Sequence, residues 1–188
     1  MPVQKPLQKK RCVERGLAAI TVYPTRVFGP GRMTDGNAAT KAIDLYMRGR
    51  LPFILEGGEQ ITSWAYVEDV ARGHVLALDW GTSGRQYILG GENVSLREVF
   101  TIVDALMAER HIRLNIPKAL AVGIAVLEEM RAKVFRARPF MTKGWVESIR
   151  QSSAFSSALA IRELGYQHTS LPEGLRRTVD WLSDQKRI

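Results

Sequence analysis

Cysteine and histidine are scarce in this sequence: its 188 residues include one cysteine, Cys12, and three histidines. One cysteine cannot form an internal disulfide, and none of the histidines has a His or Cys partner at the spacing of metal ligands. No apolar run approaches the ~18 residues that a membrane-spanning helix needs, and the basic N-terminus lacks the apolar core of a signal peptide. We therefore expect a soluble, cytoplasmic protein with no metal site and no membrane span.

A glycine-rich nucleotide fingerprint is also missing, because neither G-x-G-x-x-G nor G-x-x-G-x-x-G occurs. A complete Rossmann domain opens with a strand, such a glycine loop and a helix. The first elements predicted for this chain instead correspond to elements that lie later in such a domain, after the glycine loop.

Positive charge is abundant, with a net charge of +8, but it is spread along the chain. A nucleic-acid-binding protein is expected to gather its basic residues on one face or motif, so we predict no nucleic-acid partner. The basic residues lie near the two ends and in a middle cluster, Arg131, Lys133, Arg136 and Arg138. That middle cluster is a candidate for attracting an anionic substrate or an acidic surface.

Predicted strands and helices alternate along the chain, which favours an α/β fold. Two S-x-x-E capping boxes, Ser95 with Glu98 and Ser170 with Glu173, predict helix starts, and residues 1–15 resemble a frayed helix. The predicted strands are 17–23, 53–55, 61–67, 86–89 and 112–116, with a loop at 24–36. The predicted helices are 38–48, 70–80, 96–108, 117–134, 141–150, 157–164 and 171–183.

The first of these strands carries the most information. Residues 18–31 read A-A-I-T-V-Y-P-T-R-V-F-G-P-G, a short apolar strand that stops at Pro24 and opens into a glycine-rich loop. In α/β proteins such a strand delivers its loop to the carboxyl edge of the sheet, where ligands bind.

This loop resembles the (N/R/Y)-P-x-x-V-(Y/F)-G-P-G motif of the extended short-chain dehydrogenase/reductases, also called the NAD-dependent epimerase/dehydratase family. Further segments match that family in the same order, and the nearest resemblance is to its dihydroflavonol-reductase-like branch, which includes hopanoid-associated sugar epimerases. The matching segments are W-A-Y-V-E-D-V-A-R-G-H from Trp64, G-R-Q-Y-I-L-G-G-E-N-V-S-L-R-E from Gly84, and S-S-A-L-A-I-R-E-L-G-Y followed by S-L-P-E-G-L near the end.

The resemblance implies an incomplete Rossmann-like fold, made of late strands of the parallel sheet and a small C-terminal substrate-binding α/β lobe. Residues 1–36 would be the remnant of the nucleotide-binding domain, and residues 37–188 the substrate-binding portion, interleaved with the sheet. Pro24, Thr25 and Val27 would then lie against the nicotinamide end of NAD or NADP.

The residues expected to contact a small-molecule substrate are Asn37, Thr62, Trp64 and Tyr66. Each has a structural alternative or a departure from the family pattern. Asn37 also suits a helix cap, and the rings of Trp64 and Tyr66 share one face of a strand that is either pocket wall or core. Thr62 stands where nucleotide-sugar members carry an arginine that grips the diphosphate. Because a hydroxyl cannot replace a bidentate cation, we expect a smaller carbonyl or hydroxyl compound as substrate.

Catalysis in this family depends on a Tyr-x-x-x-Lys pair and hydride transfer to or from the nicotinamide. No tyrosine of this sequence is followed four places on by lysine. We therefore expect the C-terminal part of an NAD(P)-dependent reductase or epimerase, with no catalytic residue and inactive alone. The alternative is a non-enzymatic binding or regulatory module. The interpretation as the C-terminal part of a reductase or epimerase also predicts an exposed edge on strand 18–23, through which two copies could pair as a homodimer.

Overall fold

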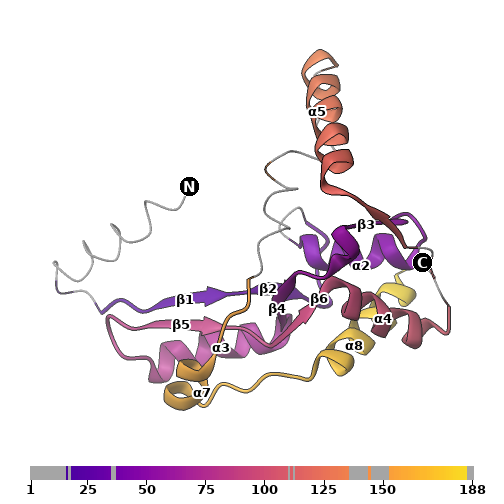
Figure 1. Cartoon of the computed structure of the whole chain (residues 1–188). Helices are drawn as coiled ribbons and strands as arrows, with labels where there is room; N and C mark the ends of the chain where they lie inside the picture. The colour runs from indigo at the N-terminus through magenta and orange to yellow at the C-terminus, as the bar shows by residue number, and fades with distance from the viewer. Residues whose placement is uncertain are drawn as a thin grey trace.

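A computed structural model describes residues 18–34, 37–109, 113–135 and 153–185, together with Gly16, His111 and Gly144. Strands and helices alternate through these residues, which confirms the α/β prediction (Figure 1). The strands are β1 (Thr21–Pro24), β2 (Arg26–Phe28), β3 (Phe53–Leu55), β4 (Ile61–Tyr66), β5 (Gln86–Leu89), β6 (Glu92–Ser95) and β7 (Leu114–Ile116). The helices are α2 (Ala38–Met47), α3 (Val67–Trp80), α4 (Leu96–Met107), α5 (Lys118–Val134), α7 (Ala158–Leu164) and α8 (Leu171–Asp184), with a 3₁₀ turn at Glu56–Gly58.

The strands pair mainly in parallel, as the Rossmann-like prediction requires. β1 runs parallel to β5, β2 to β4, and β3 to β7, whereas β6 returns antiparallel beside β4. Only Thr25 separates β1 from β2, so one extended segment pairs first with β5 and then with β4. Among the described residues β1 has no second strand partner, in keeping with the open edge expected there.

Strand β4 lies at the centre of the main hydrophobic core. Trp64 and Tyr66 on one face of β4 pack with Phe28 of β2 and with apolar side chains of α2, α4 and α8. The Phe28 ring meets Trp64 edge-on at 6.0 Å between centroids and Tyr66 at 5.9 Å. Helices α2, α4 and α8 therefore cover one side of this short sheet (Figure 1).

A second core lies beneath β1 and β5. Ala65 on the other face of β4 packs with Tyr87 and Leu89 of β5 and with apolar side chains of α3 and α7. Gly73 lets α3 approach closely, because a side-chain carbon at that position would lie 2.5 Å from Leu89. Ala65, which has no exposed surface, therefore faces a different core from its neighbours Trp64 and Tyr66.

Two of the strands, β2 and β6, were not predicted from the sequence. The predicted loop 24–36 contains β2, whose three residues were too few to show a period, and the short segment after Gly91 forms β6. Helix α3 begins at Val67, three residues before the predicted start, so that Glu68 and Asp69 lie in its first turn rather than ahead of it.

One of the two predicted capping boxes is confirmed and the other is wrong. Ser95 and Glu98 form the predicted box, with the Glu98 amide donating to Ser95 Oγ at 3.2 Å and the Ser95 amide to Glu98 Oε2 at 2.8 Å. The box at Ser170 and Glu173 is wrong, since the Ser170 side chain makes no capping bond and Glu173 accepts hydrogen bonds from Arg176 and Arg177. The predicted helices at 1–15 and 141–150 lie outside the described residues, apart from Gly144.

Asp69 joins α3 to the segment that leads into α8. Its fully buried carboxylate accepts hydrogen bonds from the Thr169 amide at 2.6 Å and from Thr169 Oγ1 at 2.9 Å, and it pairs with Arg72. The sequence interpretation of Asp69 as a cap or ion-pair partner is confirmed for the ion pair. This carboxylate connects residues a hundred positions apart in the chain.

Replacing Asp69 tests how much this connection stabilises the fold. Asp69→Asn removes the charge opposite Arg72 and one acceptor for Thr169, so we expect the free energy of unfolding to fall by about 2–3 kcal/mol. Urea denaturation followed by circular dichroism measures it. Asp79→Asn, at an exposed position of the same helix, is the matched control and should stay within about 0.5 kcal/mol. Equal losses in the two variants would contradict the role assigned to Asp69.

Tyr166 gives a second test, at alkaline pH. Burial, and then the negative charge of Asp69, raise the pKa of its phenol to about 12, although Arg72 opposes the shift. A raised pKa favours the protonated phenol in the folded state, so this stabilisation is complete below pH ~10 and is lost as pH rises towards 12. In a spectrophotometric titration at alkaline pH, Tyr166→Phe should remove a late-ionising tyrosine. Loss of a tyrosine that ionises near pH 10 would refute this.

Candidate functional site

A pocket of about 340 Å³ lies beside β1 and β5, and two of the residues predicted to contact the cofactor line it. Pro24 and Thr25 form part of its wall. The lining residues are Tyr23, Pro24, Thr25, Gln86, Ile88 and Phe155. Gln86 begins β5 and Ile88 follows two residues later, so the pocket runs along one face of the parallel β1–β5 pair. Pro24 and Thr25 bring it to the carboxyl end of β1, and the carboxyl edge is where open α/β sheets bind ligands.

Beside this pocket, Gly90 allows three hydroxyl side chains to approach one another. A side-chain carbon on Gly90 would lie 2.6 Å from Ser63 Oγ, 3.1 Å from Ser157 Oγ and 3.1 Å from the Thr25 methyl group. Ser157 Oγ is satisfied, accepting from the Gly90 amide at 2.8 Å and donating to its carbonyl at 3.2 Å. The small size of glycine is therefore what lets strands β1, β4 and β5 meet here.

Two of these hydroxyls have no hydrogen-bond partner among the described residues. Thr25 Oγ1 and Ser63 Oγ are both inaccessible to solvent and unpaired. Buried hydroxyls are normally satisfied, because leaving one unpaired costs about 1–3 kcal/mol. Of these two residues, Thr25 lines the pocket and Ser63 does not.

Phe155 is held over the pocket by an asparagine that the sequence analysis did not single out. The Phe155 amide donates to Asn93 Oδ1 at 3.1 Å, and Asn93 Nδ2 donates to the Phe155 carbonyl at 3.0 Å. Just before it, Ser153 bridges to β4, accepting from the Ser63 amide at 3.0 Å and donating to the Ile61 carbonyl at 2.8 Å. Asn93 lies within the G-G-E-N-V-S stretch that matched the family, so a signal for it was present.

The predicted substrate residues on β4 are buried away from this pocket. Trp64 and Tyr66 are each 2% exposed and belong to the main core. The Trp64 ring lies 5.3 Å from the guanidinium carbon of Arg26 and donates from Nε1 to the Val94 carbonyl at 3.3 Å. Burial, and then the charge of Glu68, raise the pKa of Tyr66. These contacts are those of core residues, and the prediction that they contact substrate has no support from this geometry.

Thr62, Val27 and Asn37 lie in three further environments. Thr62 is buried, paired with Val94 on one side and bridged to Ser153 on the other. Val27 is half-buried and packs against the second core. Asn37 occupies the N-cap position of α2, but its side chain makes no capping bond, so the capping interpretation is wrong. The structure thus brings Pro24 and Thr25 together in one pocket and leaves the other predicted residues outside its wall.

The Thr40 side chain, unlike that of Asn37, hydrogen-bonds to the backbone near the start of α2. Its Oγ1 accepts from the Gly29 amide at 3.0 Å and donates to the Gly29 carbonyl at 3.2 Å, which ties the loop after β2 to α2. Gly29 has a φ of 142°, and a side-chain carbon there would lie 2.4 Å from Val67. Gly29 therefore serves backbone geometry.

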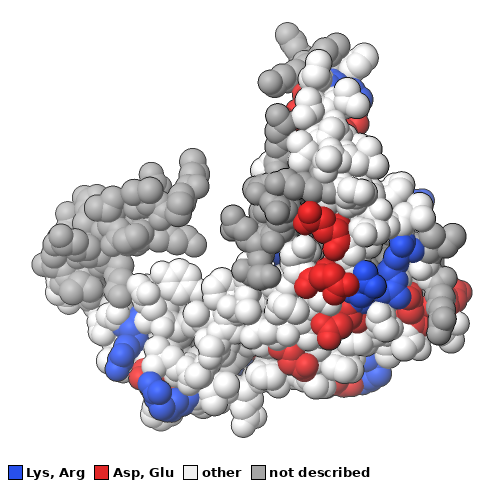
Figure 2. All heavy atoms as spheres, in the orientation of Figure 1, with Lys and Arg blue, Asp and Glu red and all other residues white. Residues whose placement is uncertain are grey.

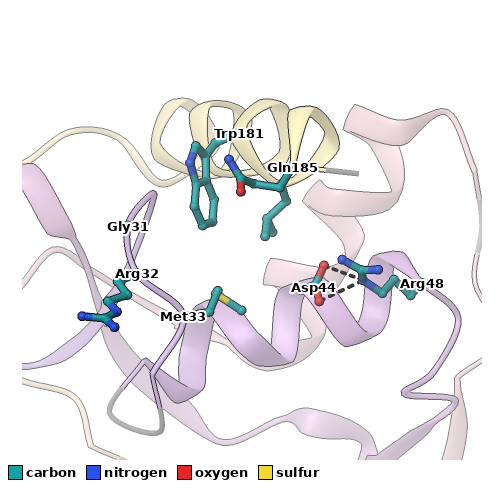
Figure 3. A pocket seen from close by; sticks show the side chains of 8 residues that line it. Gly31, Arg32, Met33, Asp44, Arg48, Trp181 and Gln185 are labelled. Atoms are coloured by element: carbon teal, nitrogen blue, oxygen red, sulfur yellow. Dashed lines mark hydrogen bonds and ion pairs between the residues drawn. The ribbon is translucent and has the colours of Figure 1, made fainter. Parts of the chain in front are cut away.

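A second hollow of about 470 Å³ lies between α2, α8 and the loop after β2 (Figure 3). Trp181 and Gln185 face Met33 across it, whereas the Arg32 side chain points away. Its other charges are already paired, because Arg48 Nε binds the Asp44 carboxylate at 2.8 and 2.9 Å. It shares no lining residue with the first pocket. It contains none of the residues predicted to contact cofactor or substrate, so it is the weaker candidate for a site.

Comparison with known proteins shows which proteins this chain is similar to. Residues 7–90 match the model of the NAD dependent epimerase/dehydratase family. The chain is 25% identical over 175 residues to a "Putative dihydroflavonol 4-reductase" of Synechocystis, covering 91% of this chain and 50% of that protein. It is 25% identical over 176 residues to "Sterol demethylase protein B" of Methylococcus capsulatus, covering 93% and 52%.

Solved structures show the same fold. The crystal structure of gox2253 superposes with a TM-score of 0.75 at 27% identity, over 98% of this chain and 55% of that one. A Bacillus cereus UDP-glucuronic acid 4-epimerase in complex with UDP-glucuronic acid and NAD gives a TM-score of 0.69 at 19% identity, over 96% and 50%. An NADPH complex of RMD from Pseudomonas aeruginosa gives 0.67 at 14%, over 96% and 53%.

The chain spans about half the length of the curated relatives it matches. The family model, these relatives and the shared Rossmann-like fold agree with one another. Over residues 7–90 the chain is similar to the NAD dependent epimerase/dehydratase family.

Proposed function

We propose that this chain supplies the nicotinamide-side wall of an NAD(P)-dependent reductase or epimerase that acts on a carbonyl or hydroxyl compound. One observation carries the proposal: the pocket beside β1 and β5 is lined by Pro24 and Thr25 at the carboxyl end of β1, and the Thr25 hydroxyl is buried without a partner among the described residues. The match of residues 7–90 to the NAD dependent epimerase/dehydratase family makes a nicotinamide cofactor the natural ligand of this pocket.

The residues of the pocket suit a nicotinamide ring. Pro24, Ile88 and Phe155 offer apolar surface to the faces of a flat ring, and Gln86 and Thr25 offer hydrogen-bonding groups to its carboxamide. When bound, the nicotinamide supplies or accepts a hydride. The chain's own task is to hold the ring and exclude water from it, and Asn93 fixes Phe155 for this by its two hydrogen bonds.

A compact carbonyl or hydroxyl substrate fits the neighbouring residues better than a nucleotide sugar. Thr62 replaces the family's diphosphate-binding arginine and is buried between β6 and the Ser153 segment. Relatives whose names refer to a dihydroflavonol and to a sterol support this choice. The sequence contains neither the glycine-rich loop nor Tyr-x-x-x-Lys, so we propose that these 188 residues by themselves carry out no turnover.

Binding of half of the cofactor tests the proposal. Reduced nicotinamide mononucleotide should shift the NMR amide signals of Tyr23, Thr25 and Phe155, whereas AMP, which has no ring to place in this pocket, should not. Thr25→Val removes the unpaired hydroxyl and should weaken nicotinamide binding by about three- to tenfold, the value of one hydrogen bond. Thr82→Val, at an exposed position in the turn before β5, should leave it unchanged.

Two results would count against the proposed function. Shifts of the same signals by AMP would show a nonspecific pocket, and no shifts with either ligand would leave the binding-module alternative in place. Turnover of a ketone with NADPH by the isolated chain would contradict only the proposed inactivity.

A further inference from the structure

The hollow between α2, α8 and the loop after β2 has the dimensions of a ligand site, and the proposed function makes no use of it. Its volume of about 470 Å³ lies within the range of ~300–1,000 Å³ that is typical of small-molecule pockets. It shares no lining residue with the pocket beside β1 and β5, and every residue of its wall belongs to the described part of the chain. The hollow is therefore a separate cavity, and its own side chains indicate what it could hold.

Trp181 and Met33 give the hollow two apolar walls. Figure 3 shows the indole ring of Trp181, from α8, and the side chain of Met33, from the loop after β2, facing each other across it. Trp181 is half-buried and packs against the main core, which holds its ring in place. Met33 is 43% exposed, and its flexible thioether can adapt to an aromatic ring. A flat ring between these two side chains would cover both.

Arg48 and Gln185 bring hydrogen-bonding groups to the same hollow. On α2, Arg48 follows Asp44 by four residues, and its Nε donates to both carboxylate oxygens at 2.8 and 2.9 Å, which fixes the guanidinium. On α8, Gln185 follows Trp181 by the same spacing, and its amide lies beside the indole ring in Figure 3. The terminal nitrogens of Arg48 and the Gln185 side-chain amide have no hydrogen-bond partner among the described residues. The hollow thus combines apolar walls with unused polar groups.

The charges around the hollow favour an uncharged ligand. Asp44 balances Arg48, and the Arg32 side chain points away from the hollow (Figure 3). Helices α2 and α8 both end beside it, at Met47 and Asp184, and the C-terminal end of a helix carries partial negative charge. On the face that Figure 2 shows, basic and acidic side chains lie next to one another around α4, with no broad surface of one charge. An anion would meet the Asp44 carboxylate and both helix ends, so Arg48 is better suited to a neutral carbonyl oxygen.

A slot for a flat ring with hydrogen-bond donors at its side is the chemistry of a site for aromatic carbonyl compounds. We propose that this hollow is a second ligand site, which takes an uncharged, flat aromatic compound that carries a carbonyl group. The ring lies between Trp181 and Met33, and the carbonyl oxygen accepts from the terminal nitrogens of Arg48. The Gln185 amide hydrogen-bonds a second polar atom of the ligand. This inference does not depend on the proposed function, because the two pockets have no residue in common.

Binding of coumarin, an uncharged bicyclic lactone, to the whole chain tests this site. In NMR spectra coumarin should shift the indole N–H signal of Trp181 and the side-chain amide signals of Gln185. The chain has four tryptophans, and the indole signal that disappears in Trp181→Leu is the one to follow. Coumarin-3-carboxylate has the same rings with a negative charge added, and it should bind at least about threefold more weakly, because Asp44 and the helix ends oppose the charge.

Two pairs of variants separate the ring contact from the hydrogen bond. Trp181→Leu removes the stacking surface and should weaken coumarin binding about three- to tenfold, whereas Trp80→Leu, at a 70% exposed position of α3, should leave it unchanged. Arg48→Gln removes the guanidinium and should weaken binding about three- to tenfold, whereas Arg50→Gln, at an exposed position two residues on, should not. Thermal denaturation verifies folding, and the exposed position of Arg48 keeps the test decisive if Trp181→Leu is unstable.

Four results would overturn this second site. No shift of the Trp181 or Gln185 signals at millimolar coumarin would show that the hollow takes no such ligand. Shifts confined to the residues that line the other pocket would place the compound there. Equal or tighter binding of coumarin-3-carboxylate would overturn the uncharged class of ligand. Losses with Arg50→Gln or Trp80→Leu equal to those of their partner variants would show that the contacts assigned here are not the ones that bind coumarin.

Discussion

Burial of β4 on both faces is the constraint on which the rest of this structure depends. From Thr62 to Tyr66 every residue of the strand is buried, so alternate side chains enter two separate cores. Trp64 and Tyr66 enter the core under α2, α4 and α8, whereas Ala65 enters the one under α3 and α7. The two rings are therefore core residues, and the candidate pocket is lined instead by residues of β1 and β5 together with Thr25 and Phe155.

Sequence reasoning succeeded where a local pattern determines local structure. The box at Ser95 and Glu98 and the strand at 86–89 depend on nearby residues, and the structure has both as predicted. It failed where a second partner competes for the same group. Glu173 binds Arg176 and Arg177 rather than capping α8, because two guanidinium groups on the same helix outcompete a backbone amide.

In the candidate site, likewise, some residues could be predicted from a local pattern and others could not. A proline at a strand end followed by a glycine loop marks a carboxyl edge, and Pro24 and Thr25 do line the pocket. The wall made by Phe155 was not predictable from such a pattern, because it requires Asn93, 62 positions earlier, to hold its backbone. The role of Gly90 likewise needs three strands in place before the crowding by Ser63, Ser157 and Thr25 becomes evident. Fold class follows from periodicity, whereas site walls follow from tertiary contacts.

Unpaired polar atoms set the candidate site apart from the two cores. Thr25 Oγ1 and Ser63 Oγ are buried and have no hydrogen-bond partner among the described residues, whereas apolar side chains fill the cores. A buried hydroxyl without a partner costs free energy that a hydrogen bond would recover. Such atoms therefore favour a polar ligand in the pocket that Thr25 lines.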